Sequence, residues 1–230
     1  MPGLTVIDYV ALAFFLVAWT GYNAAADHGR WERHGVTAAM DRYRLAWMRE
    51  MLGRDLRMVD TQIVGNLISG IGFFASATIL LVGGLVAVLG AAEQAVGALA
   101  ELPFAIATSR PAWEVKVLLL ISVFVYAFFK FAWSYRLYNY CSILIGAAPA
   151  LGPEADWSEA AEAHVQRTVA IVNRASRHFN RGLRAYFFAL AALGWFVHPW
   201  LMIFAATWVV FVLYRREFRS KALAAIRGGT

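Results

Sequence analysis

The sequence predicts an all-helical bundle that is embedded in a membrane. Of its 230 residues, 60% are hydrophobic and only 16% are charged, whereas charged residues make up about 25% of a typical soluble domain. Apolar runs of membrane-spanning length alternate along the chain with arginine-rich segments. The same composition excludes an intrinsically disordered chain, which combines low hydrophobicity with high charge.

Five apolar segments are predicted to enter the membrane: residues 4–22, 63–90, 117–136, 185–197 and 199–214. The second lies within a longer run, residues 61–92, that contains no ionisable side chain. The first segment is interpreted as a retained helix rather than a cleaved signal peptide, because residues 1–7 contain no Lys or Arg. The chain is therefore predicted to form one integral membrane domain over residues 1–230.

The last two segments have an alternative. His198 and Pro199 interrupt the apolar stretch 185–214, which forms either one long kinked span or a hairpin of two short segments. Residues 215–230 carry five cations and one glutamate, and positive residues near span ends favour the cytoplasm. This tail favours the hairpin, giving five membrane segments, with four full spans as the alternative.

The charges also predict an orientation. Residues 23–61 contain seven arginines, whereas residues 91–116 contain two cations against three glutamates. By the positive-inside rule, the first of these loops is cytoplasmic and the second external. We therefore expect the N-terminus outside and the C-terminus in the cytoplasm. The net charge of +6 is explained by topology, so no nucleic-acid partner is expected.

Two cytoplasmic segments, residues 37–60 and 156–184, are predicted to form amphipathic helices. Apolar residues recur at steps of three and four in both, while arginines lie elsewhere on the helical wheel. The apolar positions are Leu45, Met48, Leu52, Leu56 and Val59 in the first, and Val165, Val169, Val172, Phe179 and Leu183 in the second. Anionic lipid headgroups at the cytoplasmic face are the expected partners of the basic residues.

Small residues follow one face of the segment 63–90. Such residues allow helix backbones to approach closely inside a membrane, where water does not drive helices together. The face serves either contact with another copy or partner, or packing against a helix of the same chain. It comprises Gly65, Ser69, Gly72, Ser76, Gly83 and Ala87.

Lys130 and His198 are the candidate intramembrane polar residues. An ammonium group within an apolar run is costly, so Lys130 either extends to the cytoplasmic interface, pairs with a carboxylate, or lines an anion pathway. Asp8 and Asp60 are its candidate carboxylate partners. His198, at the expected hairpin turn, is either structural or a group that senses protons or contacts a ligand.

The sequence does not predict a catalytic, cofactor or metal site. It lacks the sequence patterns of serine hydrolases, zinc proteases, P-loops and Rossmann folds, so the protein is not expected to be an enzyme. Asp27, His28, Glu32 and His34 are residue types that bind metals, but their spacing matches no established site, and a solvated loop is expected there.

Several stretches carry a family resemblance. They are RDLRMVDTQI (54–63), GN (65–66), FFAS (73–76), VYAFFKFAWS (125–134), RLYNYCS (136–142), HFNRGLRAY (178–186) and YRREFR (214–219). Over nearly its whole length the sequence resembles the bacterial branch of the domain of unknown function 599 family. The resemblance implies an integral membrane protein, here of the inner membrane, and implies no reaction or ligand.

Polar residues in these stretches are expected to converge at the cytoplasmic ends of the membrane segments. Such a cluster serves either as an internal ion-pair lattice or as a site for lipid phosphate or an acidic partner. Its members are Arg54, Asp55, Arg57, Asp60, Arg136, Asn139, His178, Asn180, Arg181, Arg184, Arg215, Arg216 and Glu217. The expected function is a self-associating structural or interaction component, with a small oligomeric anion channel or carrier as the alternative.

Overall fold

The computed structural model describes residues 3–27, 34–100, 109–149 and 158–228. Over these ranges the chain forms helices and no strands, which confirms the predicted all-helical class. The helices are α1 (Val6–Asp27), α2 (Val36–Leu52), α3 (Met58–Gly90), α4 (Ala92–Ala100), α5 (Arg110–Gly146), α6 (Glu159–Val197), α7 (Pro199–Phe218) and α8 (Lys221–Ile226).

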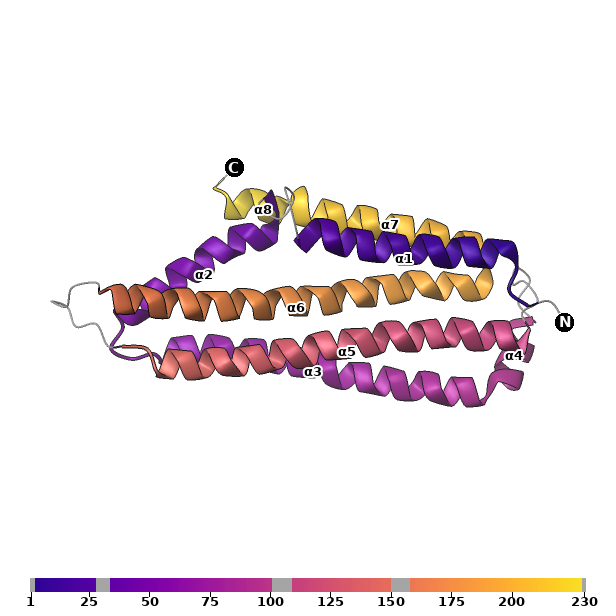
Figure 1. The fold of residues 1–230 in the computed structure, drawn as a ribbon, viewed down its shortest axis with the longest axis horizontal. Helices are drawn as coiled ribbons and strands as arrows, with labels where there is room; N and C mark the ends of the chain where they lie inside the picture. Colours follow the sequence, from indigo (N-terminus) through magenta and orange to yellow (C-terminus); the bar gives the residue numbers. More distant parts are fainter. Residues whose placement is uncertain (1–2, 28–33, 101–108, 150–157, 229–230) are drawn as a thin grey trace.

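The long helices run side by side along one axis (Figure 1). Helix α6 lies between α1 and α7 on one side and α5 and α3 on the other. The start of α1, the end of α3, the start of α5 and the α6–α7 turn lie together, at what we call the N-terminal end. Helices α2 and α8 lie toward the opposite end, which we call the arginine-rich end.

Three helices, α1, α3 and α5, are each long and apolar enough to cross a membrane. Helices α6 and α7 form a hairpin, which turns at His198 and Pro199. His198 ends α6 and caps α7, because its Nδ1 accepts a hydrogen bond from the backbone N–H of Trp200 at 3.1 Å. Pro199 then occupies the first turn of α7, where its missing N–H costs nothing.

Helices α5 and α6 are much longer than a bilayer requires. With 37 residues, α5 extends about 55 Å, compared with a hydrocarbon core of about 30 Å. Lys116 and Arg136 on α5 are 20 residues apart, a spacing of about 30 Å that matches the core. The predicted membrane segment 117–136 therefore leaves the last ten residues of α5, and the first half of α6 packed against them, beyond the predicted apolar layer at the arginine-rich end.

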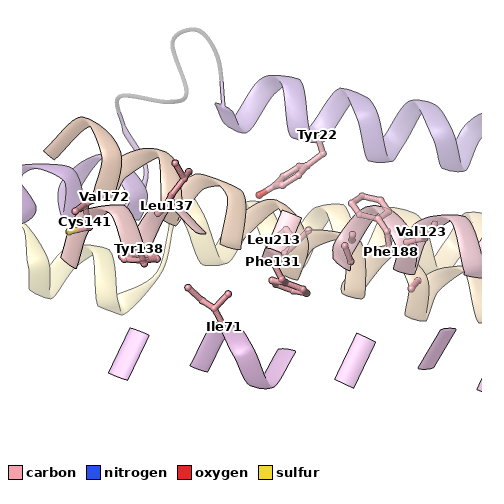
Figure 2. Packing of buried hydrophobic residues seen from close by; sticks show 14 of the residues in the cluster. Tyr22, Ile71, Val123, Phe131, Leu137, Tyr138, Cys141, Val172, Phe188 and Leu213 are labelled. Atoms are coloured by element: carbon pink, nitrogen blue, oxygen red, sulfur yellow. The ribbon is translucent and has the colours of Figure 1, made fainter. Parts of the chain in front are cut away.

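This projecting part has its own hydrophobic core. Leu137, Tyr138 and Cys141 of α5 pack with Val172 of α6 (Figure 2) and with Met48 of α2, all of them buried. Closer to the N-terminal end the core is aromatic, where the rings of Phe74 and Phe131 contact each other and those of Phe179 and Tyr186.

One glycine sets the distance between α5 and α6. A Cβ atom built at Gly182 would lie 2.5 Å from the ring of Phe131, which is fully buried. The close approach of the two helices at this level therefore requires a residue without a side chain.

The expected amphipathic helices differ from the structure in their bounds. The segment 37–60 is not one helix, because α2 ends at Leu52 with Gly53 as its C-cap and α3 begins at Met58. As a consequence Leu56 and Val59 are 74% and 62% exposed, although the sequence predicted both on the apolar face of one helix. The segments 156–184 and 185–197 are joined within the single helix α6.

Candidate functional site

The small-residue face of α3 lies mostly outside the bundle. Ser69, Ser76, Gly83 and Ala87 are exposed, and Gly65 is half-buried. A Cβ atom built at Gly65 or Gly83 would meet nothing within 4 Å, and one at Gly72 would only touch Tyr135 at 3.7 Å. The other described helices of this chain therefore leave these positions uncovered.

Helix α3 packs mainly against α5 and touches α6 through a few side chains. Phe74 stacks on Phe131, and the hydroxyl groups of Thr78 and Tyr186 lie 2.7 Å apart in a hydrogen bond. These contacts come from the side of α3 that carries its buried residues, Asp60, Val64, Ile71 and Thr78.

Lys130 lies at the surface of the bundle, half-buried between α5 and α6. Its ammonium lies over the ring of Tyr126, 4.9 Å from the centroid. Neither expected carboxylate pairs with it. Asp8 accepts hydrogen bonds from Thr5 and Trp195 at the N-terminal end, and Asp60 pairs with Arg54 at the opposite end.

A groove of about 430 Å³ opens beside Lys130. It is lined by Phe129, Lys130, Ala132, Trp133, Arg136 and His178. The Nε of Arg136 donates to the hydroxyl of Tyr140 at 2.6 Å. The Nδ1 of His178 is buried and has no hydrogen-bond partner among the described residues. We call these residues the Lys130 groove.

His178 reaches the groove from α6. Its ring meets that of Trp133 edge-on, with the ring centroids 6.4 Å apart. The Lys and Arg side chains in the lining of the groove are Lys130 and Arg136.

A closed ion-pair group lies near this groove, where α1 ends. The carboxylate of Asp27 accepts from Arg181 Nε at 2.5 Å and from Arg184 Nη1 at 2.9 Å. Arg184 also donates to Asn23 at 3.1 Å, and its guanidinium lies over Tyr22. Asp27 and Arg184 are buried, so the group ties α6 to the end of α1.

A second ion-pair group joins α2 to α3. Asp60 is fully buried and accepts from Trp47 Nε1 and from Arg54, both at 2.6 Å. Nearby, Arg57 donates to the carbonyl oxygens of Ile145 and Ala148 at the C-terminus of α5. These contacts tie the α2–α3 junction to the end of α5.

Glu217 of α7 caps α2. Its Oε1 accepts from the backbone N–H of Thr37 at 3.0 Å, where a negative charge suits the helix dipole. Arg216 lies over the ring of Phe187, 5.2 Å from the centroid. Arg215 and Arg216 also border a groove of about 410 Å³ at the end of α7, together with Trp208, Phe211, Val212, Arg219, Ser220 and Lys221. We call it the α7 groove.

The polar residues expected to form one cluster thus lie in several groups. Arg54, Arg57 and Asp60 lie at the α2–α3 junction, whereas Arg181 and Arg184 pair with Asp27 at the end of α1. Three members have a simpler setting: Asn139 donates to the Tyr135 carbonyl at 2.9 Å, Asp55 is exposed and Asn180 is half-buried.

Two polar groups were not predicted from the sequence. Asp8 accepts from Trp195 Nε1 at 2.7 Å, and the buried Lys116 lies over the ring of Trp195. Asp41 pairs with Arg44 at 2.6 Å and Arg177 at 3.2 Å, joining α2 to α6. Asp8 and Lys116 flank apolar runs, the only sequence signal available, whereas nothing in the spacing links Asp41 to Arg177.

The metal-type residues after α1 fall partly outside the described residues, which exclude His28 and Glu32. Asp27 is engaged by two arginines, and the carbonyl of His34 accepts from Arg227 at 2.7 Å. In the part of the chain that the structure describes, no three His, Cys, Asp or Glu side chains are grouped to hold a metal ion.

A comparison with protein families identifies the chain. The model of the family described as "Protein of unknown function, DUF599" matches residues 10–222, nearly the whole sequence. The chain belongs to the DUF599 family. No curated protein and no solved structure matches this DUF599 protein. Its family and its three membrane-length helices describe a helical membrane protein of unknown function.

Proposed function

We propose that this DUF599 protein is a structural or interaction component of the bacterial inner membrane that self-associates through the small-residue face of α3. The observation that carries the proposal is the exposure of that face on a helix packed along one side only. The proposed role is not catalytic, because the buried carboxylates Asp8, Asp27 and Asp60 already serve hydrogen bonds and ion pairs within the chain.

The first support is the absence of a large side chain where two helices would meet. Gly83 and Gly65 have nothing within 4 Å of a built Cβ atom, so glycine is not needed there for packing within one copy. Glycine at exposed helix positions costs up to about 1 kcal/mol relative to alanine. Glycine at these positions allows a helix of another chain to approach the α3 backbone closely.

The second support is the extent of the small-residue face. Ser69, Ser76 and Ala87 are exposed on the same side of α3 as Gly65 and Gly83, within about 40° of them around the helix. From Gly65 to Ala87 the face extends about 33 Å along the helix axis. A second helix can therefore contact it over several turns.

A second copy is the favoured partner because the same surface serves both sides of a two-fold symmetric contact. Two copies in one membrane share their orientation, so their α3 helices run parallel and present the small-residue face at the same depth. Pairs of this kind are the common use of small residues spaced by four.

The anion-channel alternative receives no support from the bundle interior. At the level of Lys130 the space between α3, α5 and α6 is filled by the rings of Phe74, Phe131 and Phe179. Lys130 itself faces the groove at the bundle surface.

The orientation is proposed from the same charges that the sequence shows. The arginines lie along α2, in the first two thirds of α6 and in the last turn of α7. These parts of the helices lie away from the N-terminal end (Figure 1), and positive charge favours the cytoplasm. A reporter fused after residue 230 is expected in the cytoplasm. External placement would contradict the assigned orientation.

The proposal is tested by the mass of the protein in nanodiscs. The wild-type protein should give a dimer or larger closed oligomer, and Gly83→Leu should give a monomer. Gly84→Leu is the matched control, because Gly84 is equally uncovered but lies about 100° further around the helix. A monomeric wild-type protein, or equal behaviour of the two variants, would refute self-association through this face.

A further inference from the structure

The Lys130 groove contains two cations whose N–H groups are not used by the protein. The ammonium of Lys130 has a ring contact with Tyr126 but no hydrogen-bond acceptor among the described residues. Arg136 uses its Nε for Tyr140, and its two terminal nitrogens have no acceptor in the same described set. Both groups are thus able to donate to a ligand.

The groove also has an excess of positive charge. Asp27 is the carboxylate that acts on Lys130, but Arg181 and Arg184 already pair with it. An anion entering the groove would therefore meet attraction from Lys130 and Arg136 without competition from a free carboxylate in its lining. An ammonium with a guanidinium is the donor combination that proteins use for phosphate.

His178 adds an independent observation. Its ring lines the groove, and its Nδ1 is buried without a hydrogen-bond partner in the described part of the chain. Unpaired buried nitrogens are rare because each one costs free energy. The lining of the groove therefore includes a residue with a polar atom that the described chain leaves unpaired.

The position of the groove specifies which phosphate it meets. Lys130 lies about 21 Å along α5 from Lys116, and Arg136 about 30 Å, so the groove begins inside the apolar layer and ends at the interface. Phe129 and Trp133, also in its lining, are 65% and 46% exposed. Aromatic and cationic side chains at this depth surround the headgroups of lipids.

We infer that the Lys130 groove binds the phosphate group of a membrane lipid, with Lys130 and Arg136 as donors and the acyl chains lying along Phe129 and Trp133. This site is separate from the small-residue face of α3, so its existence does not depend on self-association. It differs from general attraction of basic residues to an anionic surface, because Lys130 is half-buried and only two cations line the groove.

The α7 groove provides the internal control. It also combines aromatic side chains with cations, but all four of its cations are exposed, whereas Lys130 is half-buried; they are Arg215, Arg216, Arg219 and Lys221. Removing one charge there changes the net charge of the protein as much as removing Lys130 does. The two grooves therefore separate a specific site from diffuse electrostatics.

The test is native mass spectrometry of the purified protein titrated with dioctanoyl phosphatidylglycerol. The wild-type protein is expected to bind a first molecule of this lipid more tightly than any further ones. Lys130→Met and Arg136→Gln should each reduce the affinity for this first molecule about tenfold or more. Arg215→Gln should bind as the wild type does, and Lys130→Arg should retain most of the affinity. Arg136 is exposed, so its variant is expected to fold even where Lys130→Met does not.

Two further probes identify the source of the phosphate. Dioctanoylglycerol, which lacks the phosphate, should bind all variants equally weakly. Inorganic phosphate at the same concentration should not displace the lipid, and displacement would assign the groove to a free anion and contradict the lipid assignment. Equal losses for Lys130→Met and Arg215→Gln, or no loss in either Lys130→Met or Arg136→Gln, would overturn the site itself.

Discussion

Helices α6 and α3 are both long, but they differ in hydrophobic pattern and in how much of each helix is buried within the chain. Helix α6 alternates apolar and basic faces, and 15 of its 39 residues are buried within the chain. Helix α3 is apolar all round, yet only four of its 33 residues are buried. Apolar character alone therefore does not indicate burial in this protein, because lipid or a partner covers what the chain leaves exposed.

The glycines of the two helices show the same difference. Gly182 of α6 faces Phe131 so closely that a methyl group has no room, whereas Gly83 of α3 faces nothing within 4 Å. The same residue type thus serves packing inside the chain on one helix and, in our proposal, contact between chains on the other. Stability measurements separate these two uses.

The largest effect is expected from Asp27→Asn, which removes the carboxylate that holds α6 to α1. Arg184 is 5% exposed and would lose its counter-charge, which costs about 3–5 kcal/mol for a buried pair. Unfolding of the purified protein in detergent, titrated with denaturant, measures this loss.

The control for Asp27→Asn is Glu93→Gln, since Glu93 pairs with Arg110 in a solvent-exposed bridge. That change should leave unfolding unaltered. Equal stability of Asp27→Asn and the wild-type protein would show that the buried pair does not hold the two helices together.

The next effect is expected from Gly182→Ala. The added methyl group displaces the packed ring of Phe131 and moves α5 away from α6, costing about 1–3 kcal/mol. Intrinsic helix propensity alone predicts the opposite sign, a gain of up to about 1 kcal/mol. A lower thermal midpoint supports the close helix approach, and a raised one would contradict it.

The smallest effect on folding is expected from Gly83→Leu. Nothing lies within 4 Å of a Cβ atom at this exposed position, so the stability of the monomer should remain unchanged or rise by up to about 1 kcal/mol. Thermal unfolding in detergent at high dilution measures the monomer alone. Destabilisation as large as that of Gly182→Ala would show that this face packs within the chain.

The helices and the all-helical class could be predicted from the sequence because they follow from local pattern. Apolar runs identified α1, α3, α5 and the α6–α7 hairpin, and His198 with Pro199 marks the turn. The break between Leu52 and Met58 was missed, since apolar residues at helical spacing continue through it. Gly53 at the end of α2 is the signal that could have located this break.

The polar groups could be predicted only in part. The sequence identified basic residues at span ends, but the partners of Asp8, Asp27 and Asp60 depend on which helices become neighbours. Trp195 lies 187 residues from Asp8, and no spacing rule connects positions so distant. The Lys130 groove could not be predicted for the same reason, since its lining combines residues of α5 with His178 of α6.

Cysteine cross-linking in native membranes tests the central proposal, self-association through α3, most directly. Single cysteines at Ser69, Ser76 and Gly83 are compared with cysteines at Ile63 and Leu81, exposed positions roughly 160° around the helix from Gly65 and Gly83. The native Cys141 is fully buried and serves as the background. We predict covalent dimers from the small-residue positions only; equal yields at both sets, or none from the small-residue face, would contradict the account.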